Sequence, residues 1–84
     1  MRFNNMDILI KHSNLTKQKI AAMQIGSEGG LSHIFGKDWS SIGSIGERRN
    51  FGKIFKAAVI AGTIAKLEWI RIENSGRFDV YRKK

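Results

Sequence analysis

The sequence predicts an α+β fold of winged-helix type, a small domain in which short helices precede one amphipathic helix and a C-terminal β-hairpin. A capping motif at Ser44 marks the start of the amphipathic helix, apolar residues at helical spacing follow it, and two strand-like runs flank a turn near Ser75. The chain of 84 residues is long enough for one domain with a modest core. We therefore expect one compact unit.

Within that unit, residues 1–24 are expected to form an N-terminal arm or a first helix, and residues 25–84 the winged-helix-like domain. The segment Met6–Ile10 suits either a short strand or the first turns of a helix, because its apolar spacing fits both periods.

Ser13 and Asn14 are residue types that cap helices, so a helix is expected over Thr16–Met23, with its end marked by Gly26. If this segment is not helical, Lys19–Ile25 is the candidate for a third strand beside the hairpin.

Small elements are expected between these residues and the long helix. The segment Gly26–Gly30 contains three glycines, whose backbone entropy favours a turn or loop. Leu31–Phe35 reads as a short helical turn stopped by Gly36. Asp38 is placed to cap another short helix around Trp39–Ile42.

The long helix carries the clearest local signals. Ser44 and Glu47 fit a capping box, in which each side chain bonds the backbone amide of the other, so the helix should begin at Ile45. Gly62 supplies a C-terminal stop, whereas Gly52 inside the helix costs about 1 kcal/mol relative to alanine and suggests a close backbone contact. The apolar stripe consists of Phe51, Ile54, Phe55, Ala58 and Val59.

A hairpin is expected from Leu67–Ile72 and Phe78–Lys83, joined through Asn74–Gly76, whose Asn and Gly suit the positive backbone angles of a tight turn. Alternation then puts four apolar residues on the face that covers the helix stripe, and Trp69 and Tyr81 on the other face. The four are Ile70, Ile72, Phe78 and Val80.

Charge points to a polyanionic partner. The formal net charge is +8 and the isoelectric point about 10.3. Residues 1–42 carry five Lys or Arg and three Asp or Glu, whereas residues 43–84 carry ten and four, so the second half holds +6 of the total. Such a field attracts DNA, RNA, anionic lipid or an acidic protein surface.

We expect a bacterial or phage regulator that binds nucleic acid, with duplex DNA favoured, because a helix-turn-helix presents its second helix to the major groove. The Gly43–Gly46 loop leaves free amides where a phosphate can sit, although Glu47 competes for them. The predicted nucleic-acid-binding residues are Arg48, Arg49, Lys53 and Lys56 on the helix and Arg71, Arg77 and Arg82 on the hairpin. Arg49 is the candidate to read a guanine.

Other interpretations stay open. The basic side of the helix is also typical of an ordinary solvated face. A winged scaffold serves equally as a protein-binding module, for example a phage-encoded modulator that docks on a host factor through the hairpin or the N-terminal arm. RNA binding is a third alternative, with Phe78, Tyr81 or Trp69 stacking on bases. A helix-turn-helix over Thr16–Phe35 is disfavoured, because two glycines fall within its second helix.

Several classes are not favoured. With no cysteine there is no disulfide or thiolate zinc site, which fits a reducing cytoplasm. His12 and His33 are far apart in the sequence and lack clustered carboxylates, so neither a metal nor a cofactor is expected. The sequence contains no motif for a catalytic nucleophile, so an enzyme is not expected. The longest apolar run, Ala57–Ala61, is far too short to cross a membrane.

One resemblance adds to the fold prediction. The residues that carry it are Leu31-Ser32-His33-Ile34-Phe35-Gly36, Trp39, Ile42, Gly46-Glu47-Arg48-Arg49, Gly52, Phe55 and Lys56. This pattern resembles a small family of uncharacterised bacterial and phage domains, in which an F-G element and a tryptophan precede a G-E-R helix and a terminal hairpin. The resemblance covers about residues 25–83 and implies the winged-helix-like fold, not an activity.

Overall fold

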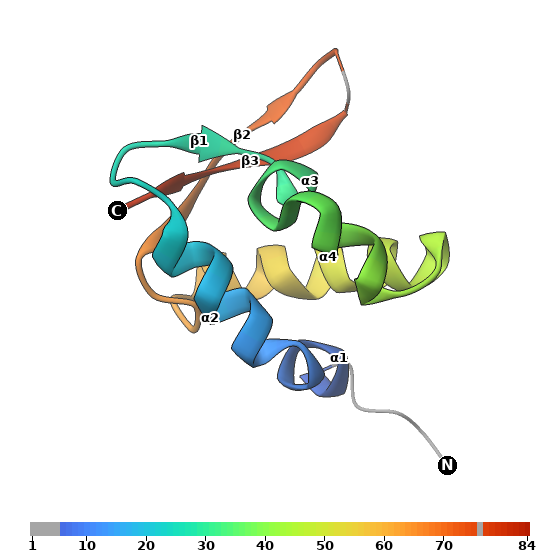
Figure 1. Cartoon of the computed structure of the whole chain (residues 1–84). Helices are drawn as coiled ribbons and strands as arrows, with labels where there is room; N and C mark the ends of the chain where they lie inside the picture. Colours follow the sequence, from blue (N-terminus) through green and yellow to red (C-terminus); the bar gives the residue numbers. More distant parts are fainter. Residues whose placement is uncertain (1–5, 76) are drawn as a thin grey trace.

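The computed structural model describes residues 6–75 and 77–84 and shows helices packed with a small antiparallel sheet (Figure 1). The elements are α1 (Met6–Lys11), α2 (Ser13–Ala22), β1 (Glu28–Gly29), α3 (Leu31–Phe35), the 3-10 helix η1 (Gly36–Ile42), α4 (Ile45–Ala61), β2 (Leu67–Glu73) and β3 (Phe78–Lys83). The strand order is β1-β3-β2. The chain is therefore the α+β, winged-helix-like domain that the sequence predicted, with its hairpin projecting beyond the helices (Figure 1).

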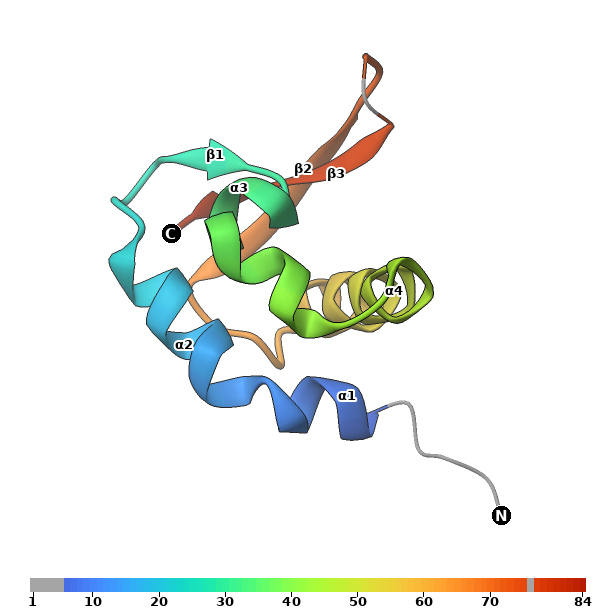
Figure 2. The same ribbon diagram turned by 45° about the vertical axis from the view of Figure 1, so that its right-hand side comes forward.

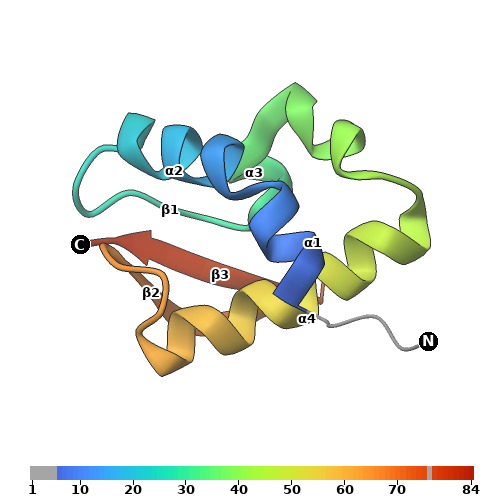
Figure 3. The same ribbon diagram turned by 90° about the horizontal axis from the view of Figure 1, so that it is seen from below.

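The segment Met6–Ile10 is helical rather than extended. Helix α1 leads into α2 with only His12 between them (Figure 2). Neither Ser13 nor Asn14 caps α2, because the His12 carbonyl accepts the Thr16 amide at 2.9 Å and α1 supplies the preceding turn. Helix α1 lies against α4 (Figure 3).

The third strand comes from the glycine-rich segment that was expected to be a loop. Glu28 pairs with Arg82 and Gly29 with Tyr81, so β1 is a two-residue edge strand on β3. Lys19–Ile25 supplies no strand, since α2 runs to Ala22. Propensity missed β1 because its backbone bonds depend on β3, more than fifty residues further along the chain.

Helix α3 confirms the helical turn at Leu31–Phe35, with Gly36 at its C-terminal end. Asp38 does not cap the following helix, which already begins at Gly36. Its carboxylate instead lies 2.7 Å from the Lys19 ammonium, and the hydrogen bond and charge of that lysine hold the pKa of Asp38 below its usual value. This pair joins α2 to η1.

Helix α4 follows the sequence closely. It begins at Ile45 and ends at Ala61, and the capping residue Gly62 has a left-handed φ of 84°. All five residues of the predicted stripe are buried: Phe51, Ile54, Phe55, Ala58 and Val59. Gly52, however, has no close backbone contact, because an added Cβ would meet only the Leu31 side chain at an ordinary 3.6 Å.

The hairpin is confirmed, but most of the predicted face assignment is wrong. Val80 is buried as expected, whereas Ile72 and Phe78 are 51% and 45% exposed. Tyr81, expected on the other face, is fully buried, with its ring centroid 5.2 Å from that of Phe55. The sheet turns its aromatic side toward α4 because a tyrosine ring buries more apolar area there than an aliphatic side chain. A register shift between Trp69 and Arg71 then breaks the alternation along β2.

The turn of the hairpin also differs from the prediction. Arg77 has a positive φ of 51°, and Asn74 does not. Gly76 lies outside the described residues.

The core is centred on aromatic rings from four elements. Phe51 and Phe55 of α4 pack edge-on against Phe35 of α3, and Trp39 of η1 and Tyr81 of β3 complete the group. Such edge-to-face pairs add to the stabilisation from buried area. The cluster fixes α4 against both α3 and the hairpin, and so determines which side of α4 meets solvent.

Candidate nucleic-acid interface

The N-terminus of α4 is closed by its own side chains. The Ser44 amide donates to Glu47 Oε1 at 2.9 Å, and the Glu47 amide donates to Ser44 Oγ at 3.2 Å, which confirms the capping box. These bonds lower the pKa of Glu47, the Ser44 amide contributing most. The ionised carboxylate therefore occupies the position that the Gly43–Gly46 loop would offer to a phosphate.

Gly43 is required for that arrangement. Its φ of 147° is unfavourable for other residues, and a Cβ there would lie 2.8 Å from the Glu47 carboxyl group. The backbone between η1 and α4 is thus folded tightly around the cap.

Two predicted cations stand on the outer surface of α4. Arg49 and Lys53 are exposed and lie one helical turn apart. Among the side chains of residues 8–75 and 77–84, neither pairs with a carboxylate. Arg48 is half-buried instead, and its buried Nε has no hydrogen-bond partner in the described part of the chain.

Asn50 belongs to the same surface and was missed at the level of sequence. It is exposed and lines, with Lys53, a shallow groove of about 450 Å³ along α4. A helical projection of residues 45–61 would have found it, since Asn50 precedes Lys53 by three positions. Asparagine pairs with adenine in the major groove and arginine with guanine. Arg49 and Asn50 are therefore two adjacent side chains of types that can contact base edges.

Lys56 is directed toward the sheet. Its Nζ lies 3.1 Å from Asp79 Oδ1 and 4.9 Å from the centre of the Trp69 ring. Trp69 Nε1 donates to the same Asp79 oxygen at 2.9 Å. The lysine charge is thus used to hold α4 against the hairpin.

Two predicted arginines of the hairpin are neutralised on the sheet's outer face, the face opposite Tyr81. Arg71 Nη1 lies 3.1 Å from Glu28, and Arg82 Nε lies 2.9 Å from Glu68. Longer approaches of 3.8 and 3.9 Å link Arg71 to Glu73 and Arg82 to Glu28. Strand pairing therefore brings three carboxylates to two guanidinium groups.

Arg77 follows the hairpin turn, is exposed, and makes no ion pair among the described residues. The hairpin tip extends away from the rest of the domain (Figures 1 and 2). Of the seven predicted residues, Arg49, Lys53 and Arg77 therefore offer unengaged charge to solvent.

The aromatic residues expected to stack on bases are placed differently. Tyr81 is buried, and burial raises the pKa of its hydroxyl, so the phenol stays neutral. Trp69 is half-buried and bonded to Asp79. Only Phe78 remains substantially exposed.

Among the described residues, no group of three or more His, Asp or Glu side chains stands close enough to hold a metal ion. Among the helices of this part of the chain, none is long and apolar enough to cross a membrane.

The fold and its surface define a small basic winged-helix-like domain. The chain belongs to the family described as a domain of unknown function (DUF1413), whose model matches residues 5–83. This match includes most of the N-terminal segment, which the sequence resemblance had left outside the family. No curated protein and no solved structure matches the chain.

Proposed function

We propose that this protein binds duplex DNA through the outer surface of α4, with the hairpin as a wing, and acts as a regulator of transcription. The observation that carries the proposal is the set Arg49, Asn50 and Lys53, exposed within the N-terminal half of α4. In a helix-turn-helix, that half of the second helix contacts base edges. Arginine and asparagine make bidentate contacts to guanine and adenine there, and lysine meets guanine or phosphate.

The element order supports this proposal. Helix α3 and η1 precede α4, and the core buries Phe51 and Phe55 on the opposite side of α4. The exposed side is therefore the one available to a groove. Arg77 at the end of the hairpin is suited to an adjacent phosphate, whereas Lys56, Arg71 and Arg82 are removed from the proposed contact set because carboxylates hold them.

The test is a titration of fluorescent duplexes of random sequence with the full chain, in which fluorescence anisotropy measures binding. Binding should be clear at about 50 mM salt and should weaken steeply as salt rises, because lysine and arginine displace counterions from phosphates. Absence of duplex binding at that salt would refute the proposal. Titration with single-stranded RNA tests the RNA alternative. If RNA is the ligand, the protein should bind single-stranded RNA more tightly than duplex DNA.

Specific contacts are tested on a duplex obtained by selection from the random pool. Arg49→Ala should lose about 1–3 kcal/mol on that site and much less on other duplexes, as expected for a residue that reads a base. Lys84→Ala is the matched control, because it removes one exposed charge at the C-terminus, on the opposite side of the molecule from the first turns of α4 (Figures 1 and 2).

A protein-binding role is the second candidate, and one observation favours it. The groove on α4 becomes apolar toward its C-terminal end, where Ala57 and Ala61 line it, and nearby Ile60 is 64% exposed. Capture of the same protein from a nuclease-treated lysate by wild type, and its loss on Ala57→Glu, would support this role. Capture that disappears with nuclease would support nucleic acid instead.

A further inference from the structure

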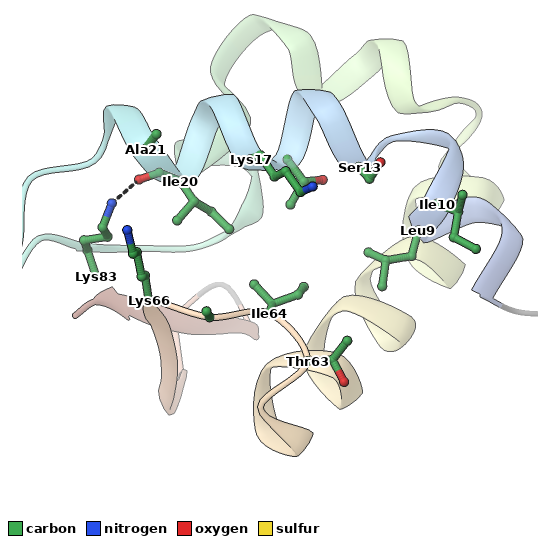
Figure 4. Close-up of a pocket in the computed structure, with 12 residues that line it drawn as sticks. Leu9, Ile10, Ser13, Lys17, Ile20, Ala21, Thr63, Ile64, Lys66 and Lys83 are labelled. Atoms are coloured by element: carbon green, nitrogen blue, oxygen red, sulfur yellow. Dashed lines mark hydrogen bonds between the residues drawn. The ribbon is translucent and has the colours of Figure 1, made fainter.

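A cavity separates α1 and α2 from the loop that joins α4 to β2 (Figure 4), and neither Arg49 nor Lys53 lines it. Its volume is about 620 Å³, within the usual range for small-molecule sites. Half of its lining residues are aliphatic, among them Leu9, Ile20 and Ile64. Such a wall favours an apolar ligand body.

One end of the cavity holds a buried lysine. Lys83 is only 7% exposed, and its ammonium group donates to the Ile20 carbonyl oxygen at 2.5 Å. No salt bridge to Lys83 occurs among the described residues. An ammonium group has three donors, and a buried charge is stabilised by an opposite charge rather than by one neutral carbonyl.

A second lysine stands at the same end. Lys66 also lines the cavity, and its side chain lies beside that of Lys83, whereas Leu9 and Ile10 lie at the far end (Figure 4). Lys17 contributes a third amine, part-way along the wall (Figure 4). No Asp or Glu is among the lining residues. The cavity thus has aliphatic side chains along its length, carries positive charge without a carboxylate in its lining, and has two lysines together at one end.

We propose that this cavity binds an amphipathic monocarboxylate, with its carboxylate held by Lys66 and Lys83 and its hydrocarbon chain along Ile20, Ile64 and Leu9. The two lysines match a single anionic head, and their charge-assisted hydrogen bonds provide orientation. The apolar walls exclude a polyanion such as nucleic acid, which needs a continuous basic track. None of the proposed DNA-contacting residues lines this cavity.

Such a ligand would connect parts of the chain that are distant in sequence. Ile20 belongs to α2, Lys66 precedes β2, and Lys83 ends β3. A molecule touching all three should stabilise the folded state by mass action, because the unfolded chain offers no such site.

The test uses decanoate as the probe, added to the full chain below its critical micelle concentration. Amide NMR shifts should change in a saturable way at Ile20, Ile64 and Lys66, and the melting temperature should rise with concentration. Decan-1-ol is the neutral control and decyltrimethylammonium the cationic one. Weaker binding of both controls supports the proposal, whereas equal binding of the alcohol, or no saturable shift with decanoate, overturns it.

One variant, compared with a matched control, locates the anion. Lys66→Gln should weaken decanoate binding by about tenfold, as expected for loss of one charge-assisted bond, and should leave decan-1-ol binding unchanged. Lys66 is exposed, so this variant is expected to fold. Lys83 is buried, so Lys83→Met is less suitable as a test. Lys37→Gln is the matched control, an exposed lysine outside the cavity. Equal loss of affinity in both lysine variants would reject a specific carboxylate site.

Discussion

The outer surface of α4 and the outer face of the sheet are both rich in arginine and lysine, but their charges are used differently. On α4, Arg49 and Lys53 face solvent without a carboxylate partner in the described chain. On the sheet, Arg71 and Arg82 meet Glu28 and Glu68 within about 3 Å. Counting basic residues along a sequence therefore overstates the charge that a hairpin presents to a partner.

The difference has a structural cause. Along a helix, a residue's neighbours are three or four positions away and can be read directly from the sequence. In a sheet they are set by strand pairing, which places Arg82 between Glu28 and Glu68. Exposed pairs of this kind contribute little stability, but they neutralise charge that would otherwise be available to phosphates.

The largest effect is expected at the contact that joins the two regions. Phe55 is fully buried and its ring packs against Tyr81, so Phe55→Ala should lower the free energy of unfolding by about 3–5 kcal/mol. Urea denaturation followed by far-UV circular dichroism measures it. Ile60→Ala, at an exposed position of the same helix, should stay within about 0.5 kcal/mol. Similar losses in both variants would mean that α4 is rotated from the described orientation.

The reliability of sequence analysis follows the same division between local and distant contacts. The cap at Ser44, the buried stripe of α4 and the stop at Gly62 were all predicted, because each depends on residues within one or two turns. The two-residue strand at Glu28 and the inward position of Tyr81 were not, because each depends on pairing with a distant segment.

In the candidate site, too, the features that depend on nearby residues were predicted and those that depend on distant residues were not. Helical spacing located Arg49 and Lys53, while the carboxylates that neutralise Arg71 and Arg82 lie 43 and 14 positions away from them. The aromatic pattern of the hairpin was misread because Trp69 precedes a register shift that strict alternation does not foresee. No local feature of the sequence marks that shift.

The connection from α4 to the hairpin gives the next effect. Gly62 ends α4 with a φ of 84°, so Gly62→Ala should destabilise the protein by about 1–2 kcal/mol. Gly52 lies inside α4, where an added methyl group would make only an ordinary contact. Gly52→Ala should therefore stabilise the protein by up to about 1 kcal/mol. Thermal denaturation of the pair compares them. Destabilisation by both would show that Gly52 is constrained by something other than the contact to Leu31.

The unequal use of charge leads to a binding prediction. Lys53→Ala should weaken association with every duplex and reduce the salt slope by about one unit, because one phosphate contact is lost. Arg71→Ala should leave that slope essentially unchanged, since its guanidinium is already paired with Glu28. Anisotropy titrations at several salt concentrations provide both slopes, with circular dichroism as the check on folding. A larger change for Arg71→Ala would place the sheet, rather than α4, against the DNA.

The smallest effect concerns the acidic residues, which cap the helix in one region and pair with arginines in the other. Bonds from Ser44 hold the pKa of Glu47 below its usual value in the folded state. A carboxyl group with a lowered folded-state pKa stabilises the protein above its unfolded-state pKa, and that contribution disappears as the pH falls through the folded-state value. Glu47→Gln should therefore melt lower than wild type at pH 7, and the difference should shrink as the pH falls below about 4.5. The two proteins differ only at this residue, so the difference between their melting curves isolates Glu47. A gap that stays constant down to acidic pH would show that the charge of Glu47 does not contribute to the cap.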